Sequence, residues 1–281
     1  MIENMGARQK TTLDPLKSQR GGFAGLFETL LRRFKNLLHM AMIVPLYLVG
    51  CAVIGLAVAP GAILVAWTVL TVSRADFSAI GAPSGGLLWW AIQGWAGGAA
   101  VVGAIFLSGL CMVFVLPAAN FVLLWGGRLK PWRGPYYSLE AIRWYIHNGI
   151  TYVLRYSLLE LFTPSPIGIL FYRLMGMKIG RGAVINSTAL SDPSLISIGE
   201  KVTIGGSVTI VGHYGQAGFL ILAPVEIGDG ATVGLRASIM GGAKIGSNAR
   251  IMPHSVVLPK TVIPDGEVWG GVPAVKMEQK V

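Results

Sequence analysis

A six-residue repeat governs the last hundred residues of the chain. Glycine often follows the repeating residue, and shorter series in other phases begin at Ile179. The longest series in one phase is Ile221, Ile227, Val233, Ile239, Ile245, Ile251, Val257, Ile263 and Trp269. This period, with β-branched residues and glycine corners, is typical of a parallel β-helix, where three short strands make one triangular coil. Residues 179–275 therefore predict a β-helix of about five coils.

The residues before the repeat predict a membrane domain. Only 13% of the chain is charged and its mean hydropathy is +0.61, whereas soluble domains are about a quarter charged. Two stretches, 41–73 and 87–125, carry no charge, and each exceeds the roughly 20 residues that a spanning helix needs. We therefore expect a membrane domain at 41–127 with two long, tilted or kinked spans, although 87–125 is long enough for two short ones.

Basic segments flank this domain. Residues 1–40 form a basic segment whose part 22–40 has the pattern of an amphipathic surface helix, and 128–178 form an aromatic, arginine-containing connector in which His147 is expected at the membrane interface. Residues 276–281 are a short tail. The net charge of +10 gathers around the apolar region, so it predicts cytoplasmic termini and contact with membrane lipids, with no nucleic-acid partner.

The residues do not favour a metal or disulfide site. Cys51 and Cys111 both lie in apolar stretches and read as small buried hydrophobes. Only two histidines, His213 and His254, lie in the repeat region, and a zinc site made of three histidines is therefore not expected.

The repeat breaks at Ile210–Phe219, in "IVGHYGQAGF", where the phase slips by one residue. A uniform prism has a smooth surface, and a bulging loop at this break would give it a pocket. His213 lies in the loop, and a histidine is suited to removing a proton near neutral pH. The glycines around it allow a close approach to a ligand. The alternative is a loop histidine without chemistry.

The last coils resemble a known superfamily. "VEIGDGATVGLRASIMGGAKIG" and "SVVLPKTVIPDGEVWGGVPAVKM" resemble the hexapeptide-repeat acyltransferases, whose prisms are left-handed. Paired apolar segments, then "PSPIGILFYRLMGMKIGRGAVIN" and "WGGVPA", are similar to the membrane-bound terminal domain of polylysine-type nonribosomal peptide synthetases. The expected fold is mixed: transmembrane helices followed by a left-handed parallel β-helix of hexapeptide repeats.

The resemblance implies a homotrimeric acyltransferase anchored in the inner or plasma membrane, with its β-helix in the cytoplasm. It would move an acyl group, preferentially acetyl, from coenzyme A to a hydroxyl or amine of a glycan, lipid-linked or amine acceptor. His213 would be the general base, with Tyr214 and Glu226 binding the acceptor. The residues expected to bind the donor are Gly234, Gly241, His254, Ser255, Lys260, Pro273 and Lys276. Direct transfer in a ternary complex is expected, because the repeat region has no cysteine.

Two other functions fit the same residues. One is an amide-bond-forming enzyme that uses aminoacyl or peptidyl thioesters, with a carrier protein as donor in place of coenzyme A. The other is a non-catalytic membrane scaffold that uses the prism for assembly. His254 has an alternative to donor binding, which is a corner residue on the surface without a ligand. The alternative for Lys260 and Lys276 is a solvated charge at the edge of the prism.

Overall fold

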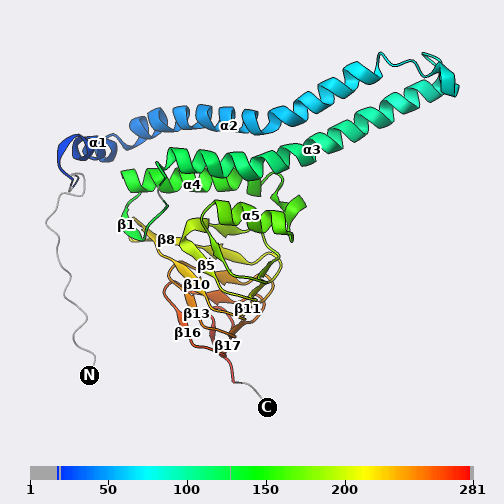
Figure 1. The fold of residues 1–281 in the computed structure, drawn as a ribbon. Coiled ribbons are helices and arrows are strands. Elements are labelled where there is room, and N and C mark those ends of the chain that lie inside the picture. The colour runs from blue at the N-terminus through cyan, green and yellow to red at the C-terminus, as the bar shows by residue number, and fades with distance from the viewer. Residues whose placement is uncertain (1–17, 19, 127, 279–281) are drawn as a thin grey trace, which may run out of the picture.

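The computed structural model describes residues 18, 20–126 and 128–278. The expectations for residues 1–17 and for the end of the tail, 279–281, lie outside the described residues. Three layers follow one another: a long helical hairpin, a layer of shorter helices, and a β-helix that tapers towards the C-terminus (Figure 1).

The hairpin consists of α2 (Lys35–Val72) and α3 (Leu87–Leu123), joined through the short 3-10 helix η1 (Ser78–Ile80). Both helices contain proline, yet each is continuous, so 87–125 forms one helix and not two. By length and composition, Val44–Val72 and Leu87–Leu123 could each cross a membrane, with mean hydropathies of 2.5 and 2.6. The preceding helix α1 (Gly22–Arg33) stops at Phe34. Residues 35–40 therefore belong to the long helix α2, and not to the surface helix that the sequence predicted over 22–40.

The connector forms the middle layer. It contains β1 (Trp132–Pro135), α4 (Leu139–Arg155), the 3-10 helix η2 (Leu159–Phe162) and α5 (Pro166–Leu174). Ser138 is the N-cap of α4: its side chain accepts a hydrogen bond from the Ala141 amide at 3.2 Å, the usual arrangement at this position. Helices α4 and α5 lie between the hairpin and the first coil of the β-helix (Figure 1).

Three parallel sheets form the walls of the β-helix. The first contains β2 (Lys178–Ile179), β5 (Ile196–Ile198), β10 (Val225–Ile227), β13 (Lys244–Ile245) and β16 (Val262–Ile263). The second contains β3 (Val184–Ile185), β6 (Thr203–Ile204), β11 (Thr232–Val233), β14 (Arg250–Ile251) and β17 (Val268–Gly270), followed by the antiparallel β18 (Val275–Lys276). The third contains β4 (Leu190–Ser191), β7 (Thr209–Val211), β12 (Ser238–Ile239) and β15 (Val256–Val257), and η3 (Pro193–Leu195) follows β4.

The aliphatic residues of the repeat stack in register along each wall. Ile227 pairs with Ile198 on one side and Ile245 on the other, and all three side chains are buried. This ladder is continuous through the coils and supplies most of the core of the β-helix. The predicted fold class, apolar helices followed by a left-handed parallel β-helix, is confirmed.

The break in the repeat is a β-hairpin. Strands β8 (His213–Gln216) and β9 (Phe219–Leu222) pair antiparallel, and β1 from the connector adds a third strand beside β9. Ile221 lies on β9 opposite Tyr214, so the prediction that it begins the aliphatic ladder is wrong. Ile210 and Ile227 occupy successive walls but lie seventeen residues apart, where Ile239 and Ile245 lie six apart. The hairpin is therefore an eleven-residue insertion at one corner, and Ile221 matched the ladder's phase only because six residues separate it from Ile227.

Candidate functional site

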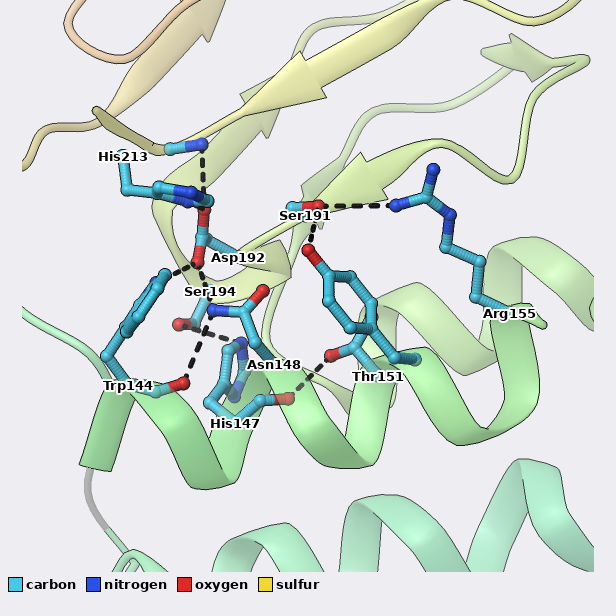
Figure 2. A network of polar contacts seen from close by, with 11 residues as sticks. Trp144, His147, Asn148, Thr151, Arg155, Ser191, Asp192, Ser194 and His213 are labelled. Carbon is cyan, nitrogen blue, oxygen red and sulfur yellow. Dashed lines mark hydrogen bonds and ion pairs between the residues drawn. The ribbon is translucent and has the colours of Figure 1, made fainter. Parts of the chain in front are cut away.

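Helix α4 presents a polar face to the first coils of the β-helix. Trp144, Asn148, Thr151 and Arg155 fall on one side of the helix at about 100° per residue. The indole of Trp144 and the amide of Asn148 both reach the corner that follows strand β4 (Figure 2). A helix that precedes the repeat thus contributes side chains to a corner of the prism.

Asp192 occupies that corner, fully buried, and it accepts hydrogen bonds from four donors. Its Oδ1 accepts from Trp144 Nε1 at 2.8 Å and from Asn148 Nδ2 at 2.6 Å. Its Oδ2 accepts from the Gly212 amide at 3.0 Å and from His213 Nδ1 at 2.5 Å. Burying a carboxylate is costly unless it is paired and hydrogen-bonded, and this carboxylate meets both conditions.

Gly212 allows the two corners to approach. A Cβ atom at this position would lie 2.9 Å from Leu195 Cβ and 3.1 Å from Asp192 Cβ, closer than neighbouring side chains tolerate. Its amide is also one of the donors to Asp192. The glycine before the histidine therefore brings strand β8 within reach of the buried carboxylate.

His213 is held in one orientation. Its Nδ1 faces Asp192, and the ring of Trp144 meets the imidazole edge-on with centroids 4.8 Å apart. The side chain is 22% exposed, and among the residues that the structure describes no group hydrogen-bonds Nε2. When Nδ1 carries its proton and donates it in a hydrogen bond to Asp192, the free lone pair of the imidazole lies on Nε2. That atom is available to take a proton from a ligand.

The electrostatics keep Asp192 ionised. Burial alone would raise the pKa of Asp192, but the hydrogen bond and charge of His213, helped by Asn148, hold that pKa below its ordinary value. A carboxylate that stays ionised fixes the tautomer of the imidazole and stabilises the imidazolium when it forms.

A second histidine lies behind this pair. His147 is fully buried, and not at a membrane interface as the sequence indicated. Burial lowers the pKa of His147 to about 4, against the opposing charge of Asp192. Its Nδ1 lies 2.9 Å from Asn120 Oδ1 on α3, and its Nε2 lies 3.5 Å from Ser194 Oγ. His147 is therefore a neutral link between the helical hairpin and the β-helix.

Four of the predicted site residues, His213, Tyr214, Gly241 and Lys260, lie along the corner between the third and first walls. His213 follows β7, Gly241 follows β12, and Lys260 follows β15. A Cβ at Gly241 would lie 3.2 Å from both the His213 amide nitrogen and Tyr214 Cδ1, and Tyr214 is buried. The Lys260 amide donates to the Gly241 carbonyl at 3.2 Å. A hollow of about 460 Å³ adjoins this corner, between β1, the hairpin and Lys260.

The other predicted residues lie elsewhere. Glu226 projects from the first wall and pairs with Lys244 at 3.1 Å. Gly234 and the exposed His254 lie at the corner between the second and third walls. Ser255 is buried at this second corner, where its hydroxyl accepts from the Gly271 amide at 3.2 Å.

The exit segment holds the last two. Pro273 follows β17, and Lys276 on β18 pairs with Glu267 at 2.5 Å. The structure therefore places Glu226, Gly234, His254, Ser255, Pro273 and Lys276 away from the corner of His213.

Sequence reasoning missed Asp192, Trp144 and Asn148. One signal pointed to Asp192: Ile185 and Ile198 are thirteen residues apart, one more than two repeats, so the phase slips at its corner as it does near His213. No such signal existed for Trp144 and Asn148, because their contact with Asp192 arises only when α4 packs on the β-helix. Within the described residues, no cluster of three or more histidine, cysteine or acidic side chains is arranged for a metal ion.

Comparison with known proteins finds a similar peptide synthetase by sequence and acetyltransferases by structure. No family model matches the chain. A delta-poly-L-ornithine synthetase of Acinetobacter baumannii is 28% identical over 173 residues, which cover 62% of this chain and 13% of that protein. A maltose O-acetyltransferase of Clostridium difficile matches 53% of this chain and 93% of its own, with 19% identity and a TM-score of 0.43.

A hexapeptide-repeat acetyltransferase of Vibrio cholerae, complexed with acetyl coenzyme A, matches 52% of this chain and 91% of its own. Its identity is 21% and its TM-score 0.39. The chain resembles the hexapeptide-repeat acetyltransferases. The similarity to a poly-ornithine synthetase agrees with the narrower resemblance to peptide synthetase terminal domains that the sequence indicated. The chain spans only about an eighth of that curated relative.

Proposed function

We propose that the protein is a membrane-anchored acyltransferase in which His213 is the general base. The observation that carries this proposal is the pairing of His213 Nδ1 with the buried Asp192, which leaves Nε2 as a proton acceptor at a partly exposed position. Nε2 removes the proton of an acceptor hydroxyl or amine as the acceptor attacks the thioester carbonyl. The new acyl–oxygen or acyl–nitrogen bond forms, the acyl–sulfur bond breaks, and the leaving thiolate receives the proton.

The hollow beside the hairpin is the place we assign to the donor thioester. It is lined by Arg133 and Lys260 together with apolar residues of β9. Two cations in the lining of an apolar hollow suit a donor such as acyl-coenzyme A, whose phosphates would pair with them while its acyl arm points along the corner.

Asp192 acts through His213 and makes no contact of its own with the reacting atoms. Trp144 and Asn148 in turn hold Asp192, so α4 completes the site that the β-helix begins. This arrangement explains why the acyltransferase prism is joined directly to the connector helices, and it argues against a scaffold role, which would need no such buried pair.

The second candidate is amide-bond formation with aminoacyl or peptidyl thioesters. The similarity to a poly-ornithine synthetase favours it. The chemistry at His213 would be the same, since an amine acceptor also loses a proton, but the donor thioester would sit on a carrier protein. The two candidates therefore differ in the donor.

The localisation is part of the same proposal. We place the segment 1–40 and the connector 128–178 at the cytoplasmic face, the domain 41–127 in the inner or plasma membrane, the prism 179–275 and tail 276–281 in the cytoplasm. A reporter fused after Val281 should be active only in the cytoplasm; activity only outside would refute this topology.

Single-turnover transfer distinguishes the candidates. The protein in detergent is mixed with labelled acetyl coenzyme A or with an aminoacyl-loaded carrier protein, and a panel of alcohols and amines is supplied as acceptor. We expect transfer from one donor, loss of about 10²–10⁴ in rate for His213→Ala, and near-normal rates for His254→Ala, whose side chain is exposed on another corner. Transfer by neither donor, with a folded protein, would favour the scaffold. Full activity of His213→Ala would refute the assigned base.

A further inference from the structure

A cavity of about 710 Å³ lies between the helical hairpin and α4. It shares no lining residue with the hollow beside the hairpin. Its walls are the α2 residues between Pro45 and Ile54, two leucines of α3, and the α4 residues between Ile142 and Val153, nearly all of them apolar. The volume is in the range of ligand sites, and no element of the described chain fills it.

The amphipathic pattern of α4 creates the cavity. Ile142, Ile146, Gly149 and Val153 follow one another at helical spacing on one face of α4 and line the cavity. The opposite face carries Trp144 and the other polar side chains that reach Asp192. One helix thus separates the polar network of the β-helix from an apolar space beneath the hairpin.

One end of the cavity is polar, and a cation lies next to it. Tyr136, Tyr137 and Tyr145 line this end, beside the start of α4. Arg143 flanks it: its Nη2 lies 3.5 Å from the carbonyl of Leu124, at the end of α3. Its Nε is buried and has no hydrogen-bond partner among the described residues. A buried guanidinium donor without a partner is costly, and an anionic group at this end would satisfy it.

The carboxylates nearest to this end are already paired. Arg20 forms ion pairs with Glu28 and with Glu140 near the start of α4. Glu28 and Glu140 therefore do not compete for Arg143, and Arg20 largely offsets the repulsion that they would exert on an incoming anion.

One wall of the cavity lies at the surface of a membrane helix. Tyr47 lines the cavity and is 71% exposed. It belongs to the segment Val44–Val72, which is long and apolar enough to cross a membrane and in which few residues are buried. An opening on this helix would face hydrocarbon, because the neighbouring side chains Val44 and Leu48 are exposed apolar residues.

We propose that this cavity binds one hydrocarbon chain of an anionic membrane phospholipid. The chain enters at Tyr47 and lies along the apolar face of α4, and the phosphate lies at Arg143 with the tyrosines around the head-group linkage. Tyrosine is suited to this place, since it has an apolar ring and a polar hydroxyl. The proposal concerns binding alone and does not depend on the acyl-transfer chemistry at His213.

Gly149 offers a variant that fills the cavity. A Cβ at Gly149 would meet no atom within 4 Å, and Gly149 lines the cavity. Gly97 on α3 is matched: it is also a helical glycine with no atom within 4 Å of an added Cβ, but it does not line the cavity. Gly149→Phe and Gly97→Phe therefore make the same chemical change inside and outside the proposed site.

The test is photocrosslinking in nanodiscs. The full chain is reconstituted with phosphatidylglycerol or phosphatidylcholine that carries a diazirine on one acyl chain, and labelled peptides are mapped after illumination. We expect phosphatidylglycerol to label the segments 45–54 and 142–153 in the wild type and in Gly97→Phe. Gly149→Phe should lose this labelling, because excluding as few as two methylenes costs about tenfold in affinity. Arg143→Gln should label equally with both lipids.

Thermal melts in the same nanodiscs show that each variant is folded. Absence of labelling at these segments in the wild type, or equal labelling of Gly149→Phe and wild type, would overturn the proposed site. A preference for phosphatidylglycerol that survives in Arg143→Gln would overturn the placement of the head group. Acyl transfer is not a readout here, so this proposal and the proposed function fail independently.

Discussion

At the scale of single residues, the site depends on one buried charge. Asp192 has no exposed surface, and each of its oxygens accepts two hydrogen bonds. Two of these donors come from α4, and two come from Gly212 and His213 directly after β7, so the carboxylate joins parts of the chain that are far apart in sequence. His147, directly behind it, is another buried titratable group near the site, and burial favours its neutral form.

His147 should make stability depend on acidity. Its folded pKa is about 4, and an unfolded histidine titrates near 6.5. As the pH falls below about 6.5, His147 becomes protonated in the unfolded chain, whereas in the folded protein it becomes protonated only near pH 4. The free energy of unfolding therefore decreases by about 3 kcal/mol across this pH window. Denaturant melts at several pH values should show a shallower decrease for His147→Gln than for wild type. The exposed His254→Gln is the control, and identical slopes for wild type and His147→Gln would contradict the burial argument.

At the scale of elements, the β-helix and its hairpin are different structures. The walls are stabilised by stacked aliphatic side chains at every sixth residue, whereas the hairpin β8–β9 is held by pairing with β1 and by the contacts of His213. The insertion therefore leaves the ladder intact above and below it: Ile210 pairs with Ile239 across the coil, and Ile198 pairs with Ile227.

Removing one residue of the ladder should weaken the whole prism. Ile227→Ala empties a site that is 4% exposed and flanked by Ile198 and Ile245, and we expect a loss of about 2–5 kcal/mol in the free energy of unfolding. Val262→Ala is the control, because Val262 lies on the same wall with its side chain 63% exposed. Unfolding followed by circular dichroism measures both. A loss for Ile227→Ala no larger than that for Val262→Ala would contradict the assigned core.

These elements also show what the sequence could and could not predict. The ladder was predictable because its period is a direct consequence of the three-walled coil, and the break at His213 was visible as a change of phase. Ile221 was misassigned because a hairpin can place an aliphatic residue in phase by coincidence. Asp192 left only a one-residue slip, and the contribution of Trp144 could not be predicted, since it depends on how a helix outside the repeat packs against it.

At the scale of the whole molecule, α4 links all three layers. It contacts the hairpin through His147 and Asn120 and the prism through Asn148 and Asp192. The catalytic corner that we propose therefore cannot form on the β-helix alone. Expression of residues 179–275 without the connector would expose Asp192 to water.

The prism also has exposed apolar side chains that a single copy leaves uncovered. They include Val184, Leu235, Met252, Leu258 and Val262. Apolar surface of this kind commonly marks a protein interface, and closed symmetric assemblies are the usual outcome for identical chains. We expect a homotrimer, measured as three copies by mass in mild detergent. A protein that is monomeric under these conditions and fully active would contradict this expectation.

The most direct test of the account is a double-mutant cycle on Asp192 and His213, read by single-turnover acyl transfer. Because Asp192 acts only through the imidazole, Asp192→Asn and His213→Ala should each lower the rate by about 10²–10⁴. The double variant should be no slower than His213→Ala alone, with thermal melts showing that all three proteins are folded. Independent, multiplicative effects of the two substitutions, or near-normal turnover in His213→Ala, would show that the buried pair is not the base of an acyl-transfer site.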